Sequence, residues 1–118
     1  MLLAHVLDDF VLQPQCLSDL KQKDWWWRKG LSKGQYRFDY LCALLIHSLS
    51  WSIMISLPIL FLGDPDRGDL YHLKVLFWVN LVIHAVVDEL KANLKLINLW
   101  VDQVIHIIQI LVLYAVCS

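Results

Sequence analysis

The fold of this chain is decided by an uncharged stretch at residues 41–62, which reads LCALLIHSLSWSIMISLPILFL. As a helix, this stretch would extend about 33 Å, close to the thickness of a bilayer core. The whole chain has 118 residues, of which 58% are hydrophobic, and its mean hydropathy is +0.55. A soluble domain of this size has too much surface to carry such a composition. The sequence therefore predicts an all-helical integral membrane protein of one domain.

Further helices are expected on either side of this stretch. Residues 70–92 and 97–117 are mostly apolar, and the short link between them predicts antiparallel neighbours. The first helix, at residues 2–20, is interrupted by Pro14, which cannot donate a backbone hydrogen bond. We predict a bundle of three full transmembrane helices, the first of them at residues 39–62, plus an N-terminal helix that spans the bilayer fully or partly.

Residues 21–38 form a loop rich in basic and tryptophan residues. Six of the ten Lys and Arg residues lie here, beside Trp25, Trp26 and Trp27. This combination is typical of a membrane–water interface, and the positive-inside rule places the loop in the cytoplasm, together with the link after residue 92. We expect a bacterial inner membrane protein. Basic and aromatic residues also occur in nucleic-acid sites, but flanking spans disfavour that interpretation, and no nucleic-acid partner is expected.

Polar residues recur at helical spacing inside the apolar segments. They form three i, i+4 pairs, to which the helix at 39–62 adds one histidine: His5 with Asp9, His84 with Asp88, Asp102 with His106, and His47. This spacing places both members of a pair on one helix face. Counted from the cytoplasmic helix ends, the positions reach one level in the inner half of the bilayer. An aspartate at the centre of a span costs about 2.5–3.5 kcal/mol, so these groups require partners.

A divalent metal, namely zinc, manganese or iron, is the leading interpretation, because histidine nitrogen and carboxylate oxygen are its usual ligands. Seven residues are candidate ligands: His5, Asp9, His47, His84, Asp88, Asp102 and His106. Gln13 and Gln103 are expected to orient these ligands through hydrogen bonds. The predicted function is metal-dependent hydrolysis of a lipid or phosphoester, with Asp88 or Asp102 as general base and Lys91 holding an anionic group.

Other functions stay open at this stage. The same residues would serve as a hydrogen-bonded network between helices. They would also serve as a proton or ion pathway, or as part of a membrane-disrupting effector. A fourth alternative is a non-enzymatic membrane subunit that binds a protein partner through its cytoplasmic loop. Whether the chain is an enzyme, and whether it self-associates, is left undecided by the sequence.

The polar motifs also carry a family resemblance. They are HVLDDFVLQ at residues 5–13, LIH at 45–47, HAVVD at 84–88 followed by Lys91, and DQVIH at 102–106. In this order they resemble a bacterial and phage membrane family known as domain of unknown function 3307, over nearly the whole chain. Asp8 stands where that family commonly has glycine, and it either adds a ligand or alters packing. The resemblance implies the fold and the choice of positions, and it assigns no activity.

Overall fold

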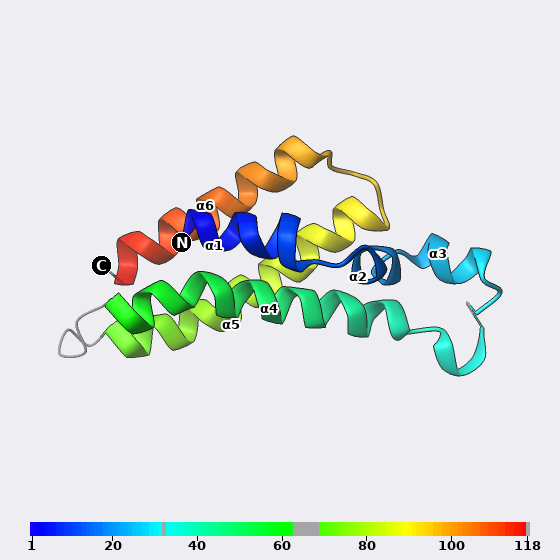
Figure 1. Ribbon diagram of the computed structural model, residues 1–118, viewed down its shortest axis with the longest axis horizontal. Coiled ribbons are helices and arrows are strands. Elements are labelled where there is room, and N and C mark those ends of the chain that lie inside the picture. The colour runs from blue at the N-terminus through cyan, green and yellow to red at the C-terminus, as the bar shows by residue number, and fades with distance from the viewer. Residues whose placement is uncertain (32, 63–68, 118) are drawn as a thin grey trace.

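Three long helices form the body of the computed structural model, which describes residues 1–31, 33–62 and 69–117. They are α4 (Asp39–Leu62), α5 (Asp69–Ala92) and α6 (Leu99–Cys117). The first two lie side by side along the long axis of the molecule, and α6 packs against α5 (Figure 1). All secondary structure in the described ranges is helical, which confirms the predicted all-helical class.

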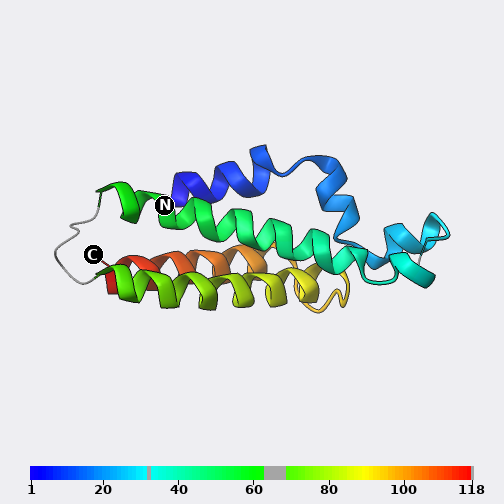
Figure 2. The same ribbon diagram turned by 90° about the horizontal axis from the view of Figure 1, so that it is seen from below.

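The expected helix at residues 2–20 is divided into three pieces. These are α1 (Leu2–Leu7), a π-helical turn η1 (Asp8–Leu12) and α2 (Gln15–Leu20). Pro14 causes the break, because it has no backbone N–H and its ψ of 152° is extended. Figure 2 shows α1 and η1 lying along α4, whereas α2 runs across its direction. π-Helical turns occur frequently at functional sites, and this one directs two consecutive aspartates, Asp8 and Asp9, toward the bundle.

The basic segment at residues 21–38 contains a short helix, α3 (Lys23–Arg28), and a single 3₁₀ turn, η2 (Gly34–Tyr36). Its contacts reach the link between α5 and α6. The Lys23 backbone N–H donates to Asn93 Oδ1 at 2.7 Å, and Lys95 Nζ donates to Asp24 Oδ2 at 2.8 Å. The two segments predicted to share one side of a membrane therefore meet at one end of the bundle.

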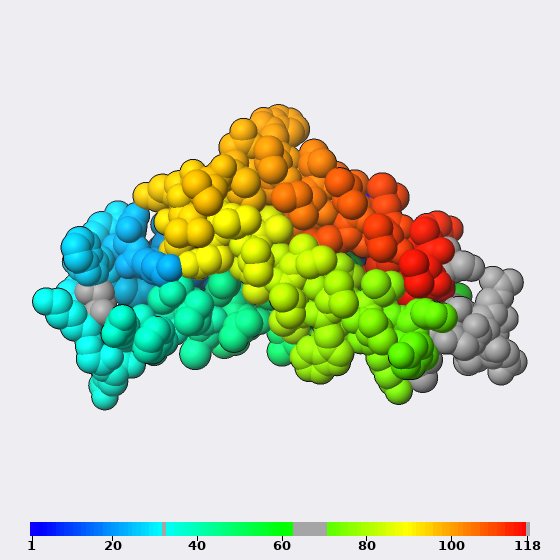
Figure 3. Space-filling model, turned by 180° about the vertical axis from the view of Figure 1, so that it is seen from behind, coloured from blue at the N-terminus to red at the C-terminus, as the bar shows by residue number. Residues whose placement is uncertain are grey.

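The interior of the described chain is more polar than apolar. It buries thirteen polar or charged residues against nine hydrophobic ones. The apolar core is a small cluster centred on Trp51, Ile55 and Leu113. Large hydrophobic side chains lie instead on the outside, and α5 and α6 form much of the face seen in Figure 3. This distribution is the reverse of that in a soluble domain.

Two of the described helices are long and apolar enough to cross a membrane, Gly34–Leu62 and Leu99–Cys117. Of the three full spans expected from the sequence, two therefore meet this criterion of length and apolar composition, and α5 does not. It is as long as α4, at 24 residues, but it carries charge at both ends, including Lys74, Asp88 and Glu89.

Candidate metal centre

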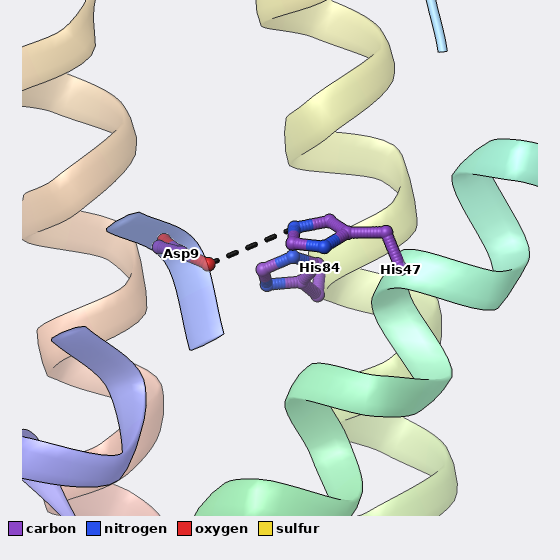
Figure 4. Close-up of side chains that lie close together, drawn as sticks. All are labelled: Asp9, His47 and His84. Carbon is purple, nitrogen blue, oxygen red and sulfur yellow. Dashed lines mark ion pairs between the residues drawn. The ribbon is translucent and has the colours of Figure 1, made fainter. Parts of the chain in front are cut away.

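Histidine and aspartate side chains from four elements converge between the helices, toward the end where α3 lies. Asp9 comes from η1, His47 from α4, His84 and Asp88 from α5, and His106 from α6. Figure 4 shows Asp9, His47 and His84 pointing toward one another. The structure thus brings together residues that the helical spacing had placed at one depth.

The ligand atoms of these residues form two overlapping groups, Asp9–His47–His84 and His84–Asp88–His106. Within each group, the candidate ligand atoms lie within 4.8 Å of one another. His47 Nε2 is 3.6 Å from Asp9 Oδ1 and 3.5 Å from Asp88 Oδ2, and His84 Nε2 is 3.8 Å from Asp88 Oδ2. Two ligands of one tetrahedral zinc ion, each about 2.0–2.1 Å from it, are roughly 3.3 Å apart. The site is therefore only slightly wider than a metal-bound one.

His84 is common to both groups and is fully buried. Its ring stacks against Trp51, at a centroid distance of 4.4 Å, and against His106, at 4.2 Å, and these two rings are themselves in contact at 5.2 Å. Neither of its ring nitrogens forms a hydrogen bond with any described residue. A buried polar group without a partner is costly, so this imidazole is packed in place yet lacks the group that would satisfy it.

Hydrogen-bond direction fixes the tautomer of His106. Gln109 Nε2 lies 3.2 Å from the backbone carbonyl of Asn80, which can only accept, so Gln109 Oε1 faces His106 Nδ1 at 3.0 Å. The proton of a neutral His106 is therefore on Nδ1, and its Nε2 carries a lone pair. That nitrogen lies 3.3 Å from Asp102 Oδ1, and neither atom has a hydrogen-bond partner among the described residues. Two acceptors this close repel unless a cation or a proton lies between them.

His5 behaves differently from the other predicted ligands. The Trp51 indole N–H donates to His5 Nδ1 at 2.8 Å, so His5 Nε2 carries the proton and donates to Gln103 Oε1 at 3.1 Å. Gln103 in turn donates to Asp102 Oδ2 at 3.2 Å and to Asp9 Oδ2 at 3.4 Å. Both His5 nitrogens are thus engaged, and in this arrangement His5 orients the site rather than offering a ligand atom. Gln103, predicted to orient the ligands, thus contacts His5, Asp9 and Asp102.

Two lysines neutralise part of the cluster. Lys21 Nζ donates to Asp88 Oδ2 at 2.7 Å, and Lys91 Nζ donates to Asp102 Oδ2 at 2.6 Å. Lys21 was expected in the cytoplasmic loop, but it directly follows α2 and is buried. Pro14 explains the difference, because the break there turns α2 and the residues after it back toward α5.

Asp8 is a further residue of the site that the sequence did not assign. It is buried, accepts a hydrogen bond from Ser50 Oγ at 2.6 Å, and places Oδ2 3.9 Å from His47 Nδ1. Asp8 therefore lies behind His47, on the side away from Asp9 and Asp88. The signal for it was its adjacency to Asp9, which becomes meaningful only once the π-helical turn is known.

The charge balance of the cluster depends on its protonation. Four carboxylates, those of Asp8, Asp9, Asp88 and Asp102, accompany the two lysine amines. With all four carboxylates ionised and the histidines neutral, two negative charges are left uncompensated, which is expensive in a buried site. A divalent cation would cancel them.

Outside the bundle, two ion pairs attach α3 to the end of α5 and to the α5–α6 link. The hydrogen bond that Lys23 donates to Glu89 raises the pKa of the Lys23 amine. The hydrogen bond from Lys95 lowers the pKa of the exposed Asp24 carboxyl. The basic segment is thereby held against the site end of the bundle.

The chain is thus a helical bundle with a buried histidine and aspartate cluster, and comparison with known families identifies it more closely. Residues 1–118 match the model of the family described as Protein of unknown function (DUF3307), so the chain belongs to that family. The match confirms the resemblance seen in the motifs. No curated protein and no solved structure matched the chain.

Proposed function

We propose that this chain is an integral membrane protein that holds a divalent metal ion at its histidine and aspartate cluster and uses it to hydrolyse a lipid or phosphoester. One observation carries the proposal: His84 is fully buried, stacked against Trp51 and His106, and has no hydrogen bond at either nitrogen within the described chain. A structural network would satisfy this ring, whereas in a metal site one of its two nitrogens is left open for the ion.

The membrane part of the proposal rests on the reversed distribution of polar and apolar residues. Exposed Trp78, Val82 and Val86 give α5 an apolar outer surface, and its 24 residues extend about 36 Å. We therefore include α5 as a third span. The segment Leu2–Leu12 before the proline break extends only about 17 Å, so we assign it as a partial span. The positive-inside rule places the α3 end in the cytoplasm of a bacterial cell.

The metal part rests on three further features of the site. With its four carboxylates ionised, the cluster has an excess of two negative charges over its two lysines, which matches a divalent ion. The lone pair of His106 Nε2 faces the cluster because Gln109 holds the proton on Nδ1. The ligand set of nitrogen and carboxylate oxygen suits zinc, manganese or iron. The ligands supported by this geometry are Asp9, His47, His84, Asp88 and His106.

Hydrolysis follows from the chemistry that such an ion supplies, because it lowers the pKa of a bound water to about 7 and so provides a nucleophile. We assign Asp102 as the general base. Asp102 lies outside both ligand groups, and hydrogen bonds from Lys91 and Gln103 to Oδ2 orient its carboxylate. Its other oxygen, Oδ1, has no hydrogen bond among the described residues and lies beside His106 Nε2. Asp88, the other predicted base, is assigned as a ligand.

The test is elemental analysis of the full chain purified in detergent. We expect a stoichiometric divalent metal in the wild type and its loss in His84→Ala. The matched control is His72→Ala, which removes an exposed histidine of the same helix and should keep the metal. Equal metal content in wild type and His84→Ala would refute the site. A metal-free wild type whose proton flux in liposomes is lost in Asp88→Asn would instead establish an ion pathway.

A further inference from the structure

A cavity of about 430 Å³ adjoins the cluster on the side of α2 and the α5–α6 link. Asp9, His47 and Asp88 form one part of its wall, and Lys21, Lys91 and Lys95 form another. Its volume is in the range of sites that hold small molecules, about 300–1,000 Å³. A ligand in this cavity would touch both the candidate metal ligands and three amines.

The two inner amines lie beside two carboxylates of the cluster. Lys21 Nζ is 2.7 Å from Asp88 Oδ2, and Lys91 Nζ is 2.6 Å from Asp102 Oδ2. Both lysines also line the cavity, so an anion drawn there by an ion at the cluster would meet both amines. Phosphate has several strong acceptor oxygens, and lysine is a common phosphate-binding residue. A neutral ester would leave both amines without a new partner.

The mouth of the cavity is both basic and apolar. Lys95 is exposed there and paired with Asp24 on the surface. Phe10 and Leu99 also line the cavity, and both are large exposed hydrophobic residues. In the proposed membrane orientation these two side chains face acyl chains at the depth of the cytoplasmic leaflet. A ligand that spans the mouth would therefore combine an anionic head with an apolar tail.

We propose that the cavity binds the phosphate group of an amphiphilic phosphate monoester, with Lys21 and Lys91 as the phosphate-binding residues. The proposal names the substrate class of the metal-dependent hydrolysis proposed above and rests on it. In the reaction, the oxygen of water bonds to phosphorus, and the bond between phosphorus and the ester oxygen breaks. The proton lost by water ends on the leaving alcohol, so the products are an alcohol and inorganic phosphate, with no change of oxidation state.

The first experiment measures binding of inorganic phosphate to the metal-loaded chain in detergent by isothermal titration calorimetry. Losing one charge-assisted hydrogen bond should weaken binding at least about tenfold in Lys91→Gln. Lys91→Arg keeps the charge beside Asp102 and should retain most of the affinity, which separates a binding defect from misfolding. Lys74→Gln, at the far end of α5, should bind phosphate like the wild type.

The second experiment separates a lipid phosphate from a soluble one. Release of inorganic phosphate is measured from phosphatidic acid in nanodiscs and from glycerol 3-phosphate in solution. We expect release from phosphatidic acid at a rate at least ten times that from glycerol 3-phosphate. Equal rates would overturn the assignment of an amphiphilic substrate.

The outcomes also distinguish this inference from the function on which it rests. A chain that carries metal but binds no phosphate, or binds it equally well in Lys91→Gln, overturns the inference and leaves the metal site standing. A chain that carries no metal overturns the proposed function. In that case, phosphate binding to the metal-free chain is compared between the wild type and Lys91→Gln. Phosphate binding that does not depend on Lys91 overturns the inference as well.

Discussion

Replacing Lys21 by methionine tests whether the metal and the lysine both interact with the carboxylate of Asp88. Methionine has nearly the length of lysine without its charge. In the metal-free chain, Lys21 Nζ donates to Asp88 Oδ2 at 2.7 Å, and both side chains are buried. Removing one member of a buried ion pair costs about 3–5 kcal/mol, because the other charge is left unpaired. We therefore expect a large loss of stability in Lys21→Met when metal is absent.

Metal should recover much of this loss. The oxygen of Asp88 that accepts from Lys21 also faces His47 Nε2 at 3.5 Å and His84 Nε2 at 3.8 Å. An ion bound to those nitrogens would neutralise the same oxygen. If metal binding restores half of the lost stability, or about 2 kcal/mol, the variant binds metal roughly 30-fold more tightly than the wild type, since each 1.4 kcal/mol is about tenfold.

The assay combines thermal unfolding, followed by circular dichroism in detergent, with competition against a metal-binding dye. With chelator, the unfolding midpoint of Lys21→Met should fall by roughly 10–20 °C, at about 4 °C per kcal/mol. Lys21→Arg keeps the charge and should lose much less. Lys74→Met, which changes an exposed lysine of α5, should match the wild type. Metal affinity in Lys21→Met that is equal to or weaker than the wild-type value would refute the shared carboxylate.

Gln109→Leu removes the acceptor that fixes the His106 tautomer and should weaken metal binding by about 10–100-fold in the dye competition, while an unchanged affinity would show that His106 is not a ligand. A spin label at Val82→Cys should show oxygen accessibility typical of lipid, and accessibility to a polar relaxation agent would contradict a span at α5. Asp24→Asn breaks an exposed pair and should leave the thermal unfolding midpoint nearly unchanged; a clear fall would mean that this pair contributes more than exposed ion pairs usually do.

The depth of the cluster was predictable from the sequence because it depends on helical spacing alone. The pairs His84 with Asp88 and Asp102 with His106 lie on continuous helices, so residues four apart share a face. His47 required only its distance from the start of a long apolar helix. Each of these three segments keeps its regular geometry in the structure, and each side chain lies in the interior as expected.

The N-terminal part was less predictable because its helix is irregular. A continuous helix at residues 2–20 would carry Lys21 to the cytoplasmic surface. The π-helical turn and the break at Pro14 instead bring Lys21 to Asp88 and turn both Asp8 and Asp9 inward. A single π-helical turn produces no periodic spacing of polar and apolar residues in the sequence. Its energetic cause is tertiary, because the inward carboxylates find partners on α4 and α6.

Which histidines are ligands was also beyond the sequence. His5 and His106 are equally plausible by spacing, since each is four residues from an aspartate. They differ in what reaches their second nitrogen. Trp51 and Gln103 occupy both nitrogens of His5, whereas Gln109 takes one nitrogen of His106 and leaves the other facing the cluster. Hydrogen-bond direction between distant segments decides the role, and spacing within a helix cannot supply it.

The lysine pairs connect metal binding with recognition of an anion. Lys21 and Lys91 are the cations that accompany Asp88 and Asp102. An ion at the histidines would take over much of the neutralisation of these carboxylates and so leave the amines with hydrogen-bonding capacity directed into the cavity. The amines would therefore offset repulsion between the carboxylates and bind an anion more tightly once the ion is in place. Phosphate affinity should then rise with metal occupancy, and by thermodynamic reciprocity phosphate should tighten the metal by the same factor.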